Sequence, residues 1–182
     1  MKKYFKLVIL SICIAFLSGC ILLMGPSEKV DAMLSKYVNC DKTIIDELDD
    51  RLNEQELNSE EKERYKNIIK KEYSQMKYEI KEEKIENDFA TVTVDIKVID
   101  LYGASLKALD YLYSNPSKFY TDGVYDSHKF IDYKLNVMEH YEETKDYTID
   151  IALSRHNDIW YIEELSEDAL LKIHGIYNYN WK

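Results

Sequence analysis

The chain has 182 residues and a formal net charge of −10, from 24 basic and 34 acidic side chains. A surface this acidic repels nucleic acid and anionic lipid headgroups, so we expect no nucleic-acid partner. The length suffices for a single domain with its own core, and five glycines and two prolines leave little room for flexible linkers.

The first 19 residues have the three parts of a secretory signal peptide. Lysines form a basic head, an apolar core follows over residues 7–16, and small residues come last. The stretch made of Leu17, Ser18, Gly19 and Cys20 then resembles the lipobox of bacterial lipoproteins.

That resemblance implies a thioether-linked diacylglycerol on Cys20 and cleavage between Gly19 and Cys20. Two acyl chains, palmitate being typical, hold a protein at a membrane lastingly, whereas one chain binds only reversibly. We therefore expect a lipid-anchored protein on the outer, extracytoplasmic face of the cell membrane, with the membrane as its partner through the N-terminal lipid.

This interpretation divides the chain into a signal peptide (1–19), a lipidated cysteine with a short tether (20–27) and one α+β extracytoplasmic domain (28–182). Loss of the signal removes three lysines and no acid, which changes the net charge from −10 to −13. The alternative is an uncleaved anchor helix, because the apolar run continues to Met24 and approaches the roughly 20 residues that span a bilayer.

The interpretation leaves Cys40 without a disulfide partner, because Cys13 lies in the signal core and Cys20 carries the lipid. We expect Cys40 to pack at a helix end as a small apolar group. A reactive thiol or an intermolecular bridge is the alternative.

Three helices are predicted next, because apolar residues recur at helical spacing up to Val38, Leu52 and Tyr73. Short polar side chains that can cap them precede each stripe. These caps are Ser27, Asp41, and Asn58 or Ser59.

The pattern then alternates with a period of two, which predicts strands. The first strand covers residues 76–81, the second covers 90–98, and Asn87-Asp88 between them is a turn signal. The second strand is β-branched with one apolar face, so the two strands form an antiparallel hairpin with one solvated side.

Helical spacing returns at Leu106–Tyr113, ends at Asn115-Pro116, and resumes after Asp126 or Ser127. A second hairpin follows, with strands at 147–154 and 160–162. A short helix beginning at Ser166 or Asp168 ends before Gly175, and the aromatic tail from Tyr177 to Trp181 is expected to dock on the domain.

The element order ααα-ββ-αα-ββ-α predicts an α+β fold with helices against one face of a curved, four-stranded antiparallel sheet. The segments 26–30, 88–94 and 157–162, Asp100 and Gly175 resemble those of uncharacterised low-GC Gram-positive lipoproteins with a nuclear-transport-factor-2-like (cystatin-like) domain. The resemblance implies a sheet wrapped by helices into an open cone, and it implies no established activity.

No residue pattern predicts catalysis, a metal or a cofactor. The four histidines, His128, His140, His156 and His174, lack paired spacing, so we expect surface or capping roles for them. Acidic residues near His140, including Glu139, are expected on a solvated helix face.

The hypothesis we favour is a non-catalytic binding or interaction module that uses the concave sheet or the aromatic tail. The alternative is a small-molecule enzyme in the cone cavity, which would need an acid such as Asp95 or Asp150 to face inward. An envelope lipoprotein with a structural or immunogenic role and no specific ligand is a third possibility.

Overall fold

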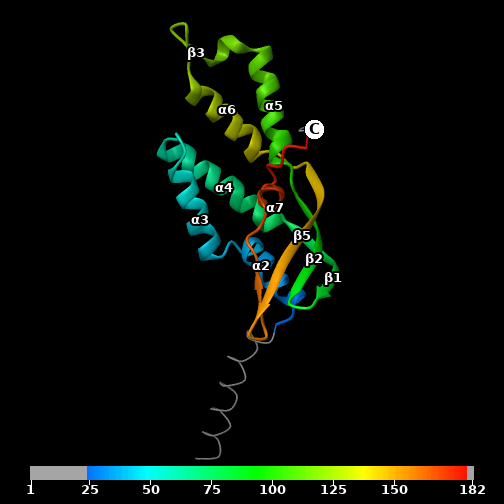
Figure 1. The fold of residues 1–182 in the computed structure, drawn as a ribbon. Coiled ribbons are helices and arrows are strands. Elements are labelled where there is room, and N and C mark those ends of the chain that lie inside the picture. Colours follow the sequence, from blue (N-terminus) through cyan, green and yellow to red (C-terminus); the bar gives the residue numbers. More distant parts are fainter. Residues whose placement is uncertain (1–23, 180–182) are drawn as a thin grey trace, which may run out of the picture.

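A four-stranded antiparallel sheet with the order β1-β2-β5-β6 forms the centre of the computed structural model, which describes residues 24–179 (Figure 1). Its strands are β1 (Lys77–Glu86), β2 (Phe89–Ile99), β5 (Thr144–His156) and β6 (Ile159–Ile162). The two predicted hairpins join through β2 and β5, which pair from Phe89 with Ser154 to Ile99 with Thr144. The predicted α+β class and the curved four-stranded sheet are confirmed.

The helices follow the predicted order. They are α2 (Pro26–Val38), α3 (Lys42–Asn53) and α4 (Ser59–Gln75) before the sheet, α5 (Leu101–Ser114) and α6 (Ser127–Glu139) between the hairpins, and α7 (Glu167–Ile173) at the end. A short 3₁₀ helix, η2 (Pro116–Phe119), and a two-residue pair of strands, β3 (Tyr120–Thr121) and β4 (Val124–Tyr125), connect α5 to α6.

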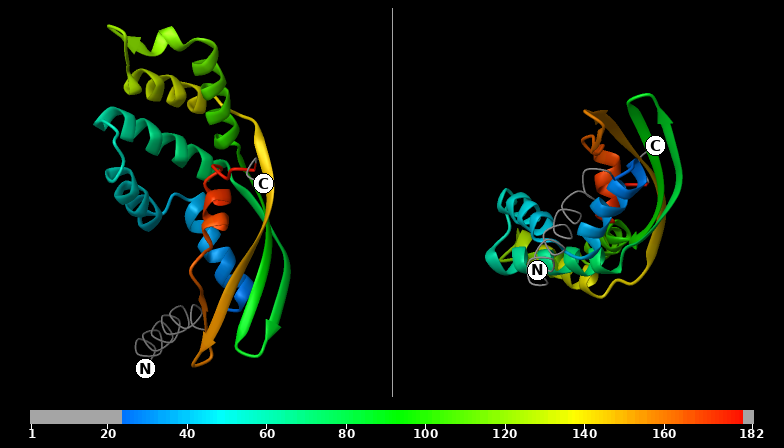
Figure 2. Two further views of the ribbon diagram at one scale, coloured as in Figure 1. Left: turned by 45° about the horizontal axis from the view of Figure 1, so that its top comes forward. Right: turned by 90° about the horizontal axis from the view of Figure 1, so that it is seen from below.

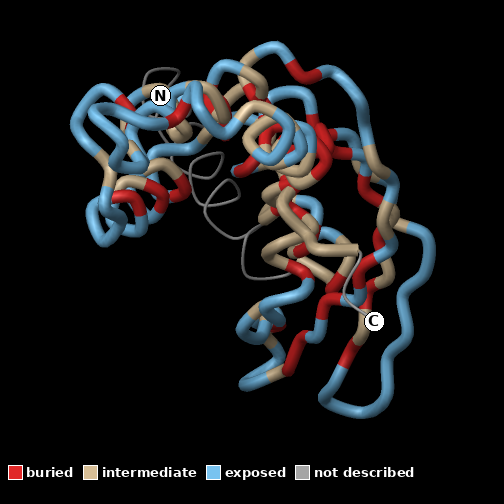
Figure 3. Tube along the Cα trace, turned by 90° about the horizontal axis from the view of Figure 1, so that it is seen from above, coloured by how far each residue is buried: buried red, intermediate tan, exposed pale blue. Residues whose placement is uncertain are grey.

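The sheet curves around α2 and α7, which cover its concave face (Figure 2). Val92, Val94 and Ile96 of β2 point into this layer and are almost fully buried, because alternate residues of a strand face opposite sides. In Figure 3 the buried segments gather where the helices meet the sheet. The concave face is therefore filled core, and it is not the open binding surface considered from the sequence.

Helices α5 and α6 form an arm that extends beyond the end of the sheet, and α6 packs along α4 (Figures 1 and 2). Arg64 of α4 holds the two together by donating to Glu139 at 2.7 Å and to Asp132. Lys71 also donates to the Glu139 carbonyl oxygen at 2.9 Å. The expectation that Glu139 lies on a solvated face is wrong, because α4 covers that side of α6.

Four helix starts agree with the predicted caps, and one does not. The side chains of Asp41, Asn58, Asp126 and Ser166 all accept from the first turn of their helices. Helix α2 begins one residue before Ser27, whose N–H donates to Glu83 at 2.9 Å instead.

Helix α5 begins at Leu101, earlier than its apolar spacing indicates, because Asp100 caps it. The Asp100 carboxylate accepts from the Gly103 N–H at 2.8 Å, and its other oxygen accepts from the Tyr179 hydroxyl at 3.0 Å. Tyr177 packs its ring on Tyr147. The tail therefore docks as expected as far as Tyr179.

Cys40 follows α2 with a φ of 49°, and its thiol lies 3.5 Å from the Lys70 carbonyl oxygen. Its side chain is partly buried against the core, which confirms the expected packing at a helix end. Among residues 24–179 no helix is long and apolar enough to cross a bilayer. The signal peptide, the lipobox residues Leu17–Gly19 and Cys20 lie outside the described residues.

Candidate ligand-binding cleft

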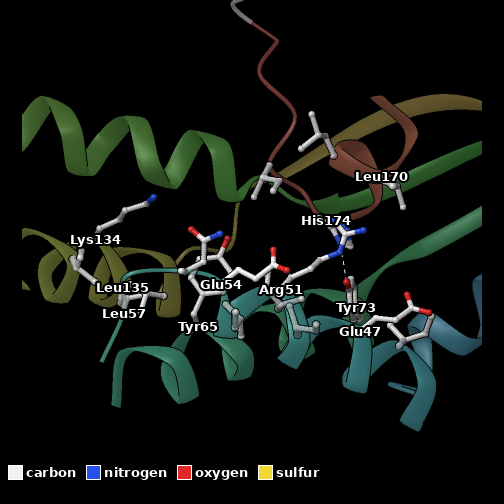
Figure 4. Close-up of a pocket in the computed structure, with 18 of the residues that line it drawn as sticks. Glu47, Arg51, Glu54, Leu57, Tyr65, Tyr73, Lys134, Leu135, Leu170 and His174 are labelled. Carbon is white, nitrogen blue, oxygen red and sulfur yellow. Dashed lines mark hydrogen bonds between the residues drawn. The ribbon is translucent and has the colours of Figure 1, made fainter. Parts of the chain in front are cut away.

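A cleft of about 750 Å³ opens between α3 and α4 on one side and α6 and α7 on the other (Figure 4). Its walls are largely apolar because each of these helices turns part of its apolar stripe toward the cleft rather than toward the sheet. Leucine, isoleucine and tyrosine side chains contribute most of this lining, including Leu48, Leu52, Leu57, Ile69, Leu135 and Leu170.

One end of the cleft is aromatic. The Tyr73 hydroxyl lies 2.7 Å from Nδ1 of His174, and the edge of the Tyr37 ring packs on Tyr73 with 5.2 Å between centroids. Burial lowers the pKa of His174 to about 4, with the nearby Arg51 charge as a second cause. His174 is therefore neutral near pH 7, and its Nδ1 shares a hydrogen bond with the Tyr73 hydroxyl, whose own pKa burial raises.

The other end of the cleft holds Lys134 of α6. Figure 4 shows its side chain directed into the space above Leu135 and Leu57. Lys134 is half-buried, whereas Arg51 and the glutamates of the lining are exposed. Burial lowers the pKa of the Lys134 ammonium.

The other three histidines lie outside the cleft and apart from one another. His128 pairs with Glu61 at 2.7 Å, which raises its pKa. His140 lies 2.8 Å from the Asn136 carbonyl oxygen, and His156 lies beside Tyr161. These positions agree with surface and capping roles, and only the half-buried His174 differs. Within residues 24–179 no group of His, Cys, Asp and Glu side chains could hold a metal ion.

The strand acids considered for an enzyme face away from the helices. Asp95 accepts a hydrogen bond from the Thr148 hydroxyl at 2.7 Å, and Asp150 accepts one from Thr93 at 2.6 Å. Both pairs lie on the convex, solvent-facing side of the sheet, because the neighbouring β2 residues Val94 and Ile96 fill the concave side. Neither acid faces an internal cavity.

Sequence reasoning did not find the cleft. Its helices come from separate parts of the chain, and Tyr73 and His174 are 101 residues apart. In the sequence, each apolar lining residue belongs to an ordinary helical stripe of apolar residues. Only the position of α6 against α4, which Arg64 fixes, assembles them into one site.

No protein-family model matches the sequence, and no curated protein shows significant sequence similarity to it. A solved structure with a similar arrangement is that of ycdA from Bacillus subtilis subsp. subtilis strain 168, a protein described as a lipoprotein. The two share 17% identity with a TM-score of 0.43, over 88% of this chain and 49% of that one. The present chain thus spans about half the length of ycdA, and a likeness this low carries no argument about ligand or activity.

Proposed function

We propose that this chain is a lipid-anchored, extracytoplasmic binding protein whose cleft holds a small and largely apolar ligand. The observation that carries the proposal is the cleft itself. Its volume of about 750 Å³ falls within the range of roughly 300–1,000 Å³ that small-molecule sites occupy, and such sites are mostly apolar with a few polar groups.

A binding role is favoured over catalysis by the state of the cleft's histidine. With a pKa of about 4, His174 is a weak base near pH 7, and its Nδ1 is already engaged by Tyr73. A general base works best when its pKa lies near the working pH. A small-molecule enzyme therefore remains the weaker alternative.

The anchor rests on the sequence Leu17-Ser18-Gly19-Cys20. Four residues separate Cys20 from Gly25, and an extended chain covers about 3.5 Å per residue, so a lipid on Cys20 would keep the domain close to the membrane. The curved sheet with helices on its concave face supports the resemblance to a nuclear-transport-factor-2-like domain, which stays part of this proposal.

Replacement of Cys20 by alanine is expected to abolish incorporation of a labelled fatty acid, because the substitution removes the thiol that would accept diacylglycerol. Metabolic labelling of cells followed by precipitation of the protein measures this. Cys40→Ala is the matched control and should label like the wild type. Labelling that survives in Cys20→Ala would exclude the lipoprotein assignment.

Replacement of Leu170 by tryptophan is expected to fill the aromatic end of the cleft and to weaken binding of an uncharged apolar dye at least tenfold. The lipid-anchored protein is held in nanodiscs, and phenylnaphthylamine fluorescence measures the binding. Protein-free nanodiscs give the background signal. Leu109→Trp on α5, outside the cleft, is the control. Equal dye binding by wild type and both variants would contradict a ligand site in the cleft.

A further inference from the structure

We propose that the cleft binds an amphipathic anion, an alkyl chain with a carboxylate or phosphate head, and that the head pairs with the Lys134 ammonium. This inference rests on the proposed binding function and specifies its ligand class. It follows from the position of one cation in an apolar space and from the distribution of the other charges around that space.

Lys134 is not paired with an acidic side chain in the part of the chain that the structure describes. Within residues 24–179 its ammonium makes no hydrogen bond or ion pair, although α6 carries two acids, Asp132 and Glu139, close to it in sequence. Both of these carboxylates pair with Arg64 of α4 instead. The ammonium extends over Leu135 into the cleft (Figure 4).

A half-buried ammonium without a partner is costly, because it loses water and gains no compensating charge. Most lysines avoid this cost by extending the amine to solvent while the methylenes cover apolar surface. The lowered pKa of Lys134 reflects the same loss of water. An anionic head within hydrogen-bond distance would restore the missing interaction, and charge-assisted pairs are the strong ones.

The least exposed charge of the described cleft lining is positive. The glutamates of the lining, Glu47, Glu54, Glu56 and Glu167, are all exposed to solvent. Arg51 is exposed too, and helical spacing puts it on the same side of α3 as Glu47 and Glu54, which carry the opposite charge. Lys134 is the half-buried charge of the described lining.

The length of the cleft indicates that the ligand also has an alkyl chain. Figure 4 places Lys134 at one end and the Tyr73–His174 pair at the other, with the apolar Leu57 and Tyr65 between them and the charged Glu54 and Arg51 beside these. A head on Lys134 leaves this apolar length for a chain, and each buried methylene contributes about 0.8 kcal/mol. A small hydrophilic anion would gain only the head contact.

The test uses the full-length protein isolated from membranes and held in nanodiscs of uncharged lipid, with empty nanodiscs as the background. Equilibrium dialysis below the micelle concentration measures binding of labelled dodecanoate, dodecyl phosphate, methyl dodecanoate and dodecyltrimethylammonium. The variants are Lys134→Gln, Lys134→Arg and Arg51→Gln. Lys129→Gln is the matched control, because Lys129 lies on the same helix, is exposed and does not line the cleft.

We expect one or both anions to bind at least tenfold more tightly than the ester and the cation. Lys134→Gln should remove that preference and leave the ester within about twofold, while Lys134→Arg and Lys129→Gln retain it. The comparison of dodecanoate with dodecyl phosphate identifies the head. Circular dichroism melting confirms that each variant is folded, so a loss of binding is not a loss of structure.

Three results would overturn the inference. Equal binding of the ester and the anions, or tighter binding of the cation, would show that Lys134 selects no head group. A loss of anion binding in Arg51→Gln with none in Lys134→Gln would move the head to the other end. In each of these cases the proposed binding function would still hold if Leu170→Trp blocks binding of the dye. If the wild type binds neither the dye nor any of the four labelled compounds, both the inference and the proposed function are overturned.

Discussion

Replacement of Glu72 by glutamine is expected to stabilise the protein increasingly as the pH rises. Glu72 lies on α4 with no exposed surface, and both of its carboxylate oxygens lack a hydrogen-bond partner within the described residues. Burial raises its pKa to about 9, so the folded protein holds this carboxyl protonated near neutral pH.

The sign follows from proton binding. The unfolded carboxyl titrates near its ordinary value of about 4.3, so between that pH and about 9 the folded state binds one proton more than the unfolded state. Stability from this group is therefore full below the lower value and falls as the pH rises, by about 1.4 kcal/mol per unit. Glutamine has the same shape and does not titrate.

Urea unfolding at a series of pH values measures the effect. The advantage of Glu72→Gln over the wild type should grow by up to roughly 4 kcal/mol between pH 5 and pH 8. His174 makes the opposite contribution, because it is neutral in the folded protein and adds stability as the pH rises from about 4 toward its unfolded pKa. This contribution is the same in both proteins, so it cancels in the difference between their free energies of unfolding. Glu63→Gln, exposed on the same helix, is the control. Parallel pH profiles for Glu72→Gln and wild type would show that Glu72 ionises normally.

Replacement of Gly175 by alanine is expected to destabilise the protein by about 3–5 kcal/mol. Two costs combine there. Gly175 has a φ of +66°, which side-chain-bearing residues rarely adopt, and a Cβ at this position would lie 2.2 Å from the Ile99 carbonyl oxygen. The Gly175 carbonyl also accepts from the Tyr102 N–H at 2.9 Å, so a shift of this backbone would disturb the start of α5.

Gly123→Ala separates the two costs. Gly123 has a similar φ of +79°, but no atom lies within 4 Å of the position its Cβ would take. Its substitution should cost only the backbone part, on the order of 1–2 kcal/mol. Denaturant midpoints with unchanged slopes give both values. Equal losses for the two variants would mean that the chain around Gly175 relaxes without strain.

The sequence itself determined those elements whose formation depends on local patterns. Strand β2 was predictable because its alternation of Val and Ile with polar residues directs one face to a core, whatever covers that face. The caps Asp41, Asn58 and Asp126 were predictable because a short acceptor side chain reaches the N–H groups of the next turn. The described part of the tail, up to Tyr179, docks on the domain as its aromatic composition suggested.

Local patterns could not reveal which helices and strands pack against one another. An apolar stripe indicates that a helix buries one face, and it does not indicate whether a sheet, another helix or a cleft lies against it. Glu139 was placed in solvent because its sequence neighbours are acidic, whereas Arg64 from a distant helix covers it. His174 was expected at the surface or in a capping role, whereas burial keeps its ring neutral and the Tyr73 hydroxyl shares a hydrogen bond with its Nδ1.

The sequence alone thus determined the α+β class and the order of the elements, because short-range sterics and capping depend on consecutive residues. The anchor at Cys20 stays a prediction. The tertiary structure decided the rest. It filled the concave face of the sheet, turned Asp95 and Asp150 to solvent, and assembled a cleft around Lys134. The physical reason is that burial and charge pairing depend on distance in space, and residues far apart in the chain set them.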